Sequence, residues 1–184
     1  MLLTLDISTS CTGYCVFDEN GIRDIGFIDL SKHKGMYEKG QKVKTELLKL
    51  MIKHPYNKVV VEENLQAFRP GLSSAKTLMT LAQFNGVVRW ICYADLDCDV
   101  EAINVNSARK IVGLKIDRKD KSKTTKEKVW EWVKASNKED AFKIEWPTKV
   151  LKSGPNKGQT RLCNEAYDMA DAYVIAKAYT IENS

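Results

Sequence analysis

The sequence predicts an α/β fold built on a mixed five-stranded sheet that is flanked by helices. Three short apolar segments at the start of the chain are separated by brief polar turns, which predicts an antiparallel three-strand meander. Two later apolar runs alternate with segments of helical period, which is typical of parallel strands covered by helices. A chain of 184 residues is long enough for one hydrophobic core. We therefore expect a single domain over residues 1–184.

The expected meander consists of Leu2–Asp6, Gly13–Phe17 and Ile22–Leu30. Between the second and third of these strands, Asp18-Glu-Asn-Gly21 supplies the residues of a hairpin turn. The first strand is apolar until it ends in the carboxylate of Asp6.

Helical spacing follows the meander. The spacing of the apolar residues predicts a helix over Met36–Lys53, which Pro55 ends. The next segment, Lys58–Glu63, contains three consecutive valines, and its length and β-branched residues favour a buried, parallel strand. A long helix then runs to about Tyr93, and either Ser73 or Ser74 caps it.

The second half of the chain begins with an expected strand, Asp99–Val105, and a short helix that ends at Gly113. The expected elements beyond it are a basic loop (Lys115–Lys126), a helix (Lys126–Ala135), a flexible basic insertion (about 137–162) and a final helix (about Cys163–Ile181).

Positive charge is concentrated in one segment. Residues 109–161 contain 16 Lys and Arg against 7 Asp and Glu, a net charge of +9, whereas the rest of the chain carries 13 against 17, a net charge of −4. This division fits a protein that holds metal in one place and a polyanion beside it. The alternative is that the basic run forms a solvated surface loop.

Two aspartates in the final helix are the strongest sign of chemistry. Asp168 and Asp171 lie three residues apart in an apolar stretch, so their carboxylates share one face of the helix. Like charges placed side by side are unfavourable unless a cation neutralises them. Hard oxygen ligands of this kind suit Mg²⁺ or Mn²⁺.

Asp6 and Glu62 complete a set of four carboxylates. The expected strand order allows them to lie at neighbouring positions of one sheet, where the final helix can cover them. Such a set could bind two divalent ions for phosphodiester cleavage. Taken alone, Asp6 could instead be a turn former at the end of a strand. Glu63 is the alternative to Glu62, because successive residues of a strand face opposite sides.

The remaining composition narrows the class of protein. The five cysteines are odd in number and form no C-x-x-C pair, so zinc and a disulfide framework are both unexpected. There is no basic leader and no apolar run long enough to cross a bilayer. We expect a soluble protein of the cytoplasm that has no membrane partner.

Four segments together resemble the RuvC-type Holliday junction resolvases, which have a ribonuclease H-like fold. They occur in the expected order along nearly the whole chain: Leu5–Val16, Val59–Glu62, Ser107–Gly113 and Tyr167–Ala172. The resemblance implies a homodimer that cuts four-way or other branched DNA by paired nicking. It also implies metal ligation by Asp6, Glu62, Asp168 and Asp171, with two Mg²⁺ ions that Mn²⁺ can replace.

The family also uses basic residues to hold phosphates. Lys126 matches one of these lysines and is an expected catalytic residue, while Arg109 and Lys110 are candidates for another. Phe68 is a candidate for the aromatic wedge that follows the catalytic glutamate in the family. We expect DNA contacts from these residues and from the basic loop, namely from Phe68, Arg109, Lys110, Lys119, Lys121, Lys123 and Lys126.

The sequence departs from bacterial members in three places. Ile7-Ser8 stands where they have Pro-Gly, the loop after Glu62 is longer, and the insertion at 137–162 is larger and more basic. This drift is more typical of a phage or viral relative. A phage-encoded protein would act in the cytoplasm of the host.

Other functions remain as alternatives. A ribonuclease H-like nuclease with less selectivity for branched DNA would use the same four carboxylates. The start of the chain, Asp6-Ile-Ser-Thr-Ser10 followed by a hairpin, is also similar to the first phosphate loop of actin-like and sugar-kinase phosphotransferases, which need a second domain. A catalytically idle junction-binding protein is a third alternative.

Overall fold

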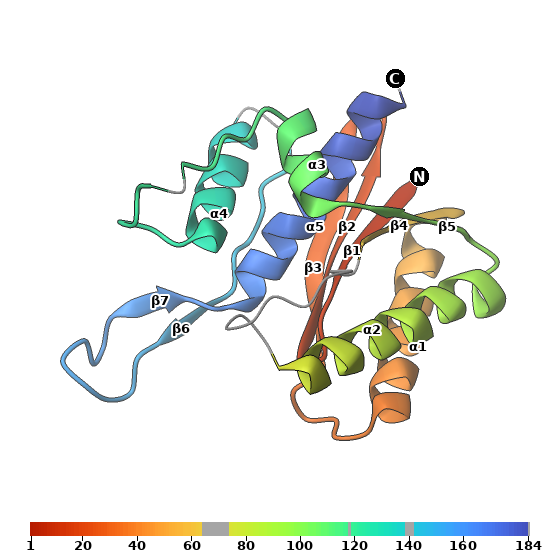
Figure 1. Cartoon of the computed structure of the whole chain (residues 1–184), viewed down its shortest axis with the longest axis horizontal. Helices are drawn as coiled ribbons and strands as arrows, with labels where there is room; N and C mark the ends of the chain where they lie inside the picture. The colour runs from red at the N-terminus through yellow and green to blue at the C-terminus, as the bar shows by residue number, and fades with distance from the viewer. Residues whose placement is uncertain (64–73, 118, 139–141, 184) are drawn as a thin grey trace.

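The protein is built around a five-stranded sheet with helices on both faces (Figure 1). The computed structural model describes residues 1–63, 74–117, 119–138 and 142–183. The sheet has the order β3-β2-β1-β4-β5. Its strands are β1 (Leu2–Ile7), β2 (Cys11–Asp18), β3 (Gly21–Asp29), β4 (Lys58–Glu62) and β5 (Asp99–Ile103). The first three strands pair antiparallel, and β4 runs parallel to both β1 and β5. The expected mixed sheet with its meander is therefore confirmed.

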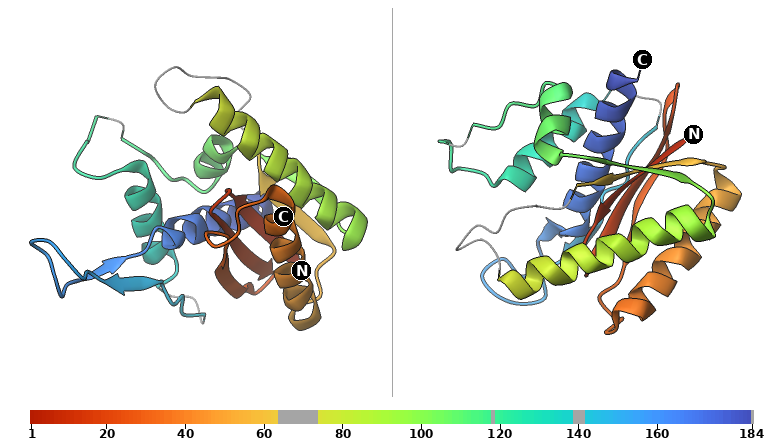
Figure 2. Two further views of the ribbon diagram at one scale, coloured as in Figure 1. Left: turned by 90° about the horizontal axis from the view of Figure 1, so that it is seen from below. Right: turned by 45° about the vertical axis from the view of Figure 1, so that its right-hand side comes forward.

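Helices form a layer on each face of this sheet. One layer consists of α1 (Met36–Lys53) and α2 (Ala75–Trp90), and α2 continues into a short π-helix, η1 (Ile91–Asp95). The other layer consists of α5 (Glu165–Glu182), with α3 (Val105–Ile111) and α4 (Thr125–Ser136) beside it. Both views of Figure 2 show α5 and α1 on opposite sides of the strands.

Strand alternation decides which side chains face which layer. In β1, Leu3, Leu5 and Ile7 pack into the core under α1 and α2, together with Val43 and Phe84. The intervening residues Leu2, Thr4 and Asp6 therefore face α5, and the buried Thr4 hydroxyl donates a hydrogen bond of 2.7 Å to the carbonyl of Ala172 in that helix. A second core lies between α3, α4, α5 and the meander, where it includes Cys15, Val129 and Tyr173.

Side-chain caps fix where several helices begin. Ser74 accepts a hydrogen bond from the amide of Thr77, which identifies it as the cap of α2; Ser73 lies outside the described residues. Thr124 and Glu127 form a capping box at α4, and each side chain accepts a bond from the other's amide. Asn104 caps α3. The expected strand over Asp99–Val105 was too long, because this cap ends β5 at Ile103.

The basic insertion contains regular structure that was not expected from the sequence. Residues Thr148–Val150 (β6) and Thr160–Leu162 (β7) form an antiparallel hairpin rather than a flexible excursion. The hairpin projects away from the sheet (Figure 1). Gly154 and Gly158 both have positive φ, 83° and 87°, in the turn that joins the strands.

Within the described ranges, none of the helices is both long enough and apolar enough to cross a membrane.

Candidate active site

A cleft of about 380 Å³ opens where β1 and β4 end beneath the first half of α5. All four predicted carboxylates line it. Its walls come from β1 and the residues after it, β4, α2, α3, α4 and α5, and the lining residues are Asp6, Ile7, Ser8, Glu62, Glu63, Leu81, Asn85, Val105, Asn106, Arg109, Lys126, Asp168 and Asp171.

Sheet register places Asp6 beside Glu62. The parallel strands β1 and β4 pair residue by residue up to Leu5 and Val61, so the next residue of each strand carries a carboxylate. Val59 and Val61 are part of the core under α1 and α2. Because side chains alternate, Asp6 and Glu62 both project on the side of α5.

Close packing between α5 and the sheet places the other two carboxylates. Asp168 and Asp171 have exposures of only 8% and 5%. Gly13 of β2 lies directly under the backbone of Asp168, and a Cβ atom at position 13 would be 2.2 Å from the Asp168 carbonyl oxygen. The hydrogen bond from Thr4 to Ala172 holds the next turn of α5. The absence of a side chain at Gly13 and the hydrogen bond from Thr4 together set the distance between α5 and the sheet.

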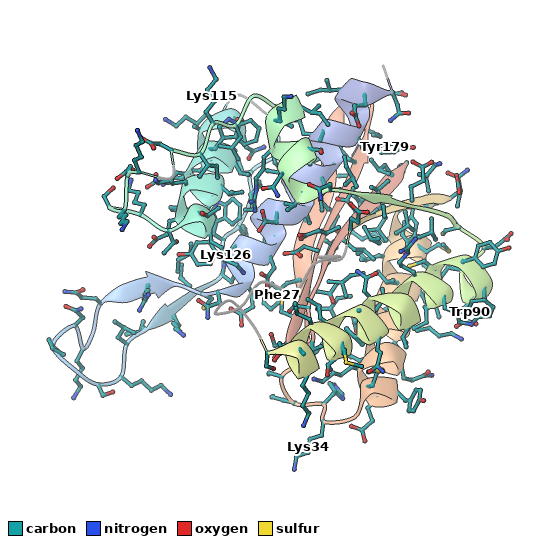
Figure 3. All side chains as sticks on the ribbon, viewed as in Figure 1. Phe27, Lys34, Trp90, Lys115, Lys126 and Tyr179 are labelled. Carbon is teal, nitrogen blue, oxygen red and sulfur yellow. The ribbon has the colours of Figure 1, made fainter. Side chains whose placement is uncertain are left out.

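Two cations lie among these carboxylates. Arg109 of α3 donates a hydrogen bond of 2.8 Å from Nη2 to Oδ1 of Asp171. This ion pair is largely buried, since the two side chains are 16% and 7% exposed. Lys126, in the first turn of α4, bonds Oδ1 of Asp168 at 3.1 Å while 56% of its own side chain stays exposed. Figure 3 labels Lys126 where α4 begins, beside α5.

Burial and mutual repulsion disfavour the ionised forms of the carboxyl groups in the cleft. Burial raises the pKa of Asp6 well above its ordinary value of 3.8, and the charges of Glu62, Asp171 and Asp168 raise it further. Burial also raises the pKa of Glu62 and of Asp168, although Lys126 opposes the effect on Asp168. Partial burial acts to lower the pKa of Lys126, but the attraction of Asp168 raises it overall. The cleft therefore favours the entry of positive charge.

This donor set fits a divalent cation by charge and by ligand type. Five carboxylates (Asp6, Glu62, Glu63, Asp168 and Asp171) line the cleft against the two cations of Arg109 and Lys126, so the negative charges are in excess, and divalent ions would neutralise this excess. Oxygen donors of this kind suit Mg²⁺ and Mn²⁺. In the described part of the chain, no three carboxylate, thiol or imidazole groups already enclose a metal position. Asp168 and Asp171 instead point to Lys126 and Arg109. Metal binding would require the carboxylates to turn toward the ion.

Two polar residues of the cleft differ from the expectation, because Glu63 was expected only as an alternative to Glu62 and Asn85 was not expected at all. Glu63 lines it together with Glu62, although only one of the two was expected to face the site. Because β4 ends at Glu62, strand alternation no longer applies to Glu63, whose carboxylate accepts a bond of 3.4 Å from Asn104. Asn85 of α2 is 3% exposed and donates to the backbone carbonyl of Glu62 at 3.4 Å. Its only signal in the sequence was a polar residue among the apolar positions of a helix.

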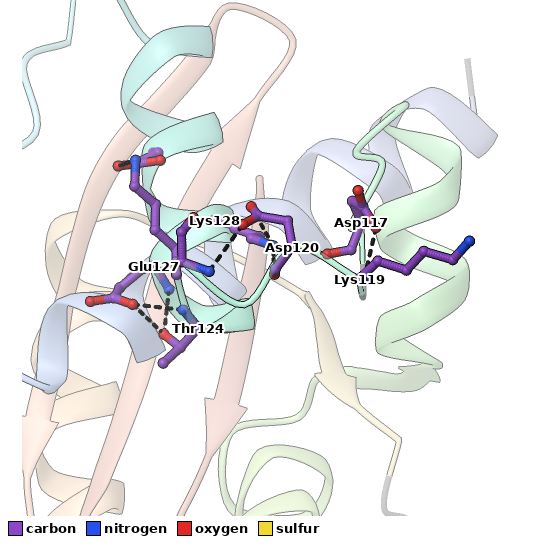
Figure 4. A network of polar contacts seen from close by, with 9 residues as sticks. Asp117, Lys119, Asp120, Thr124, Glu127 and Lys128 are labelled. Atoms are coloured by element: carbon purple, nitrogen blue, oxygen red, sulfur yellow. Dashed lines mark hydrogen bonds and ion pairs between the residues drawn. The ribbon is translucent and has the colours of Figure 1, made fainter.

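The candidate DNA-binding residues differ in how far they are buried. Arg109 is largely buried, whereas Lys110, Lys119, Lys121 and Lys123 are exposed. The loop that carries three of these lysines is held to α4, because Lys128 donates to the carbonyls of Asp117 and Asp120 (Figure 4). The side chain of Lys119 extends away from this network in the same view. Lys123 pairs with Glu131 at 2.5 Å.

A second, basic pocket adjoins the cleft. It has a volume of about 450 Å³ and shares Asn106 and Arg109 with the cleft. Its other walls come from Lys110, Gly113, Leu114, Lys115, Ile116 and Thr125. Phe68, the candidate wedge, lies outside the described residues.

Comparisons with known proteins identify the fold. The sequence matches no protein-family model, and no curated protein is significantly similar to it. Among solved structures, Thermus thermophilus RuvC in complex with a Holliday junction substrate aligns with a TM-score of 0.62 and 14% identity over 100% of this chain and 95% of that chain. Another T. thermophilus RuvC structure aligns with a TM-score of 0.58 and 15% identity, over 99% and 94% of the two chains.

A further similar structure is that of the yeast mitochondrial Holliday junction resolvase Ydc2. It aligns with a TM-score of 0.56 and 17% identity over 98% of this chain and 77% of that chain. At these identities the similarity concerns the fold. The chain therefore has the α/β, ribonuclease H-like fold of the RuvC-type Holliday junction resolvases.

Proposed function

We propose that this protein is a metal-dependent endonuclease that resolves four-way and other branched DNA by paired nicking of phosphodiester bonds. The observation that carries the proposal is the convergence of Asp6, Glu62, Asp168 and Asp171 in one cleft. The shared fold supports it, because one similar structure is RuvC with a Holliday junction substrate. The basic pocket beside the cleft supplies a complementary surface for DNA phosphates.

The four carboxylates would hold Mg²⁺, and two ions per site would suit a phosphodiester substrate. When bound, the metal supplies the Lewis acidity that assists attack of water on phosphorus and departure of the leaving oxygen. The backbone positions of Asp6 and Glu62 are held by the sheet, since the two residues belong to β1 and β4. Lys126 is exposed enough to reach a phosphate and would stabilise the negative charge that develops there.

The DNA backbone would pass from the cleft over the basic pocket. Lys110 and Lys115 line that pocket, and Arg109 joins it to the cleft. The exposed lysines of the loop before α4 continue the positive surface. Phosphate contacts of this kind position a nucleic acid without reading its sequence. Selection of branched DNA must therefore come from the shape of the substrate.

A homodimer would place two such sites on one junction. A four-way junction has two-fold character, which a symmetric dimer matches. The outer surface of α2 and η1 offers an apolar contact, because Met79, Trp90 and Tyr93 are all more than 60% exposed there. Figure 3 labels Trp90 on this surface. The five cysteines are free thiols, which is compatible with the reducing cytoplasm.

End-labelled junction cleavage tests the proposal. A four-way junction and a linear duplex of the same sequence are incubated with the protein and Mg²⁺. We expect paired, symmetric nicks in the junction and little cutting of the duplex. Equal cutting of both would identify a less selective ribonuclease H-like nuclease. Binding of the junction without cleavage would identify an idle junction-binding protein, and ATP hydrolysis would favour the phosphotransferase.

A further inference from the structure

The β6–β7 hairpin is a basic projection that contributes no residue to the cleft. Residues 148–163 contain Lys149, Lys152, Lys157 and Arg161 and no acidic residue. The hairpin extends from the body in Figure 1 and in the left view of Figure 2. All three residues of β6 are exposed, as are two of the three in β7. It therefore contributes little to the core.

The register of the hairpin places like charges together. Lys149 is directly opposite Arg161 in the antiparallel pair. Side chains at such positions lie on the same face with Cβ atoms about 5 Å apart, where like charges repel each other. Among the described residues, neither cation forms an ion pair within 4 Å. Arg161 does act on Glu127, whose pKa is lowered first by hydrogen bonds with Thr124 and also by the charge of Arg161. An anion on this face would relieve the repulsion.

The base of the hairpin connects it to the cleft. The amide of Cys163 donates to the carbonyl of Pro147 at 2.9 Å, which closes the base. Helix α5 begins two residues later, at Glu165, and has Asp168 in its first turn. Asp168 in turn contacts Lys126, in the first turn of α4, so the base of the hairpin leads directly to this edge of the cleft. A polyanion that leaves the cleft past Lys126 would meet the hairpin.

We propose that the β6–β7 hairpin binds a duplex arm of the branched DNA substrate, close to the branch point that the cleft holds. The proposal rests on the proposed function and adds a second contact to it. A two-stranded ribbon fits the major groove of B-DNA. The five residues 148–152, which precede the bend at Ser153, span roughly 16 Å, or about five base pairs of helical rise. Lys149 and Arg161 would contact phosphates near the base of the hairpin. Lys152 and Lys157 lie toward the tip.

The test compares binding of junctions with long arms and with arms cut to a few base pairs. Asp6→Asn serves as the non-cleaving parent, and the variant adds Lys149→Ala and Arg161→Ala. The matched control adds Lys49→Ala and Lys53→Ala, which remove the same charge from the far half of α1, where both lysines are in ion pairs. Thermal unfolding confirms that all forms fold. A second variant replaces residues 151–159 by Asn-Gly, which shortens the hairpin while retaining a two-residue turn.

We expect the hairpin variant to bind long-armed junctions about tenfold more weakly, with a salt dependence reduced by about two phosphate contacts. The hairpin variant should bind short-armed junctions with the same affinity as the parent. The control variant should bind long-armed and short-armed junctions with the same affinity as the parent. Equal binding to long arms by variant and parent would overturn the proposal, as would an equal loss on short arms. If the parent binds linear duplex as well as junctions, the junction-resolving function fails, while the hairpin effect is still measured on the duplex. A parent that binds no DNA would overturn both.

Discussion

The Cα atom of Gly13 lies directly against the backbone carbonyl of Asp168. A Cβ atom at position 13 would come within 2.2 Å of that oxygen and 2.3 Å of its carbon. The obstacle is helix backbone, which cannot move aside as the end of a flexible side chain can. A single hydrogen atom at Gly13 therefore allows α5 to approach the sheet closely enough to bring two carboxylates to Asp6 and Glu62.

Gly13→Ala is expected to destabilise the fold by about 3 kcal/mol, because α5 must move away from β2. Gly35→Ala is the control: its Cβ would meet only the Glu38 side chain at 3.6 Å or more. Chemical denaturation measures both variants. Equal stability of Gly13→Ala and the wild type would show that the close approach does not restrict this position.

The raised carboxylate pKa values predict how stability depends on pH. Because the pKa values of Asp6, Glu62 and Asp168 are raised in the folded state, that state holds more protons than the unfolded state above a pH of about 4. Their contribution to stability is therefore present at low pH and is lost as pH rises through the raised folded values. In chelator, Asp6→Asn should be more stable than the wild type at neutral pH, and the difference should shrink in acid.

Thermal unfolding across pH measures this effect, with Asp29→Asn as the control. The pKa of Asp29 is lowered by hydrogen bonds from Ser31, so that substitution should cost stability at neutral pH. Added Mg²⁺ should stabilise the wild type more than Asp6→Asn, because it binds the ionised carboxylates. If chelator and Mg²⁺ give the same unfolding temperatures, the cleft does not bind the ion.

The Arg109–Asp171 pair predicts a large local effect. Arg109→Met should cost about 3 kcal/mol in chelator, because it leaves a buried carboxylate without its partner. Lys110→Met, the exposed neighbour, should change stability by less than about 0.5 kcal/mol. In an Asp171→Asn background the cost of Arg109→Met should largely disappear. A cost that persists there would mean that Arg109 acts through packing.

Lys126→Ala should slow DNA cleavage by about a hundredfold with little change in stability, since its side chain is mostly exposed and its ion pair is partly solvated. Lys134→Ala is the matched control, because Lys134 lies in the last turn of the same helix. Single-turnover cleavage rates at saturating protein separate the chemical step from binding. A hundredfold loss in both variants would point to the general charge of α4 instead.

Much of the fold could be predicted because apolar periodicity is strong where burial is strong. The limits of α1 agree with the prediction at both ends, since its buried stripe and Pro55 are both visible in the sequence. The β6–β7 hairpin was missed for the opposite reason. Its strands have three residues each and are exposed, so the only signal was a few β-branched residues around a glycine-containing turn.

The candidate site was predicted in its residues but not in its contacts. The spacing of Asp168 and Asp171 and the ends of two strands indicated which carboxylates converge. The close approach at Gly13 and the ion pair of Arg109 depend on how elements distant in sequence pack together. No periodicity encodes that packing. The roles of Lys110, Lys119, Lys121 and Lys123 in DNA binding stay predictions, because they depend on a partner.

Cleavage of a labelled four-way junction by the wild type and by Asp6→Asn tests most directly whether the carboxylate cleft is a metal-dependent nuclease site. We predict nicks by the wild type in Mg²⁺ and in Mn²⁺, none in chelator, and none by Asp6→Asn, although that variant still folds and binds the junction. Undiminished cleavage by a folded Asp6→Asn protein, or by the wild type in chelator, would show that the carboxylate cleft is not a metal-dependent nuclease site.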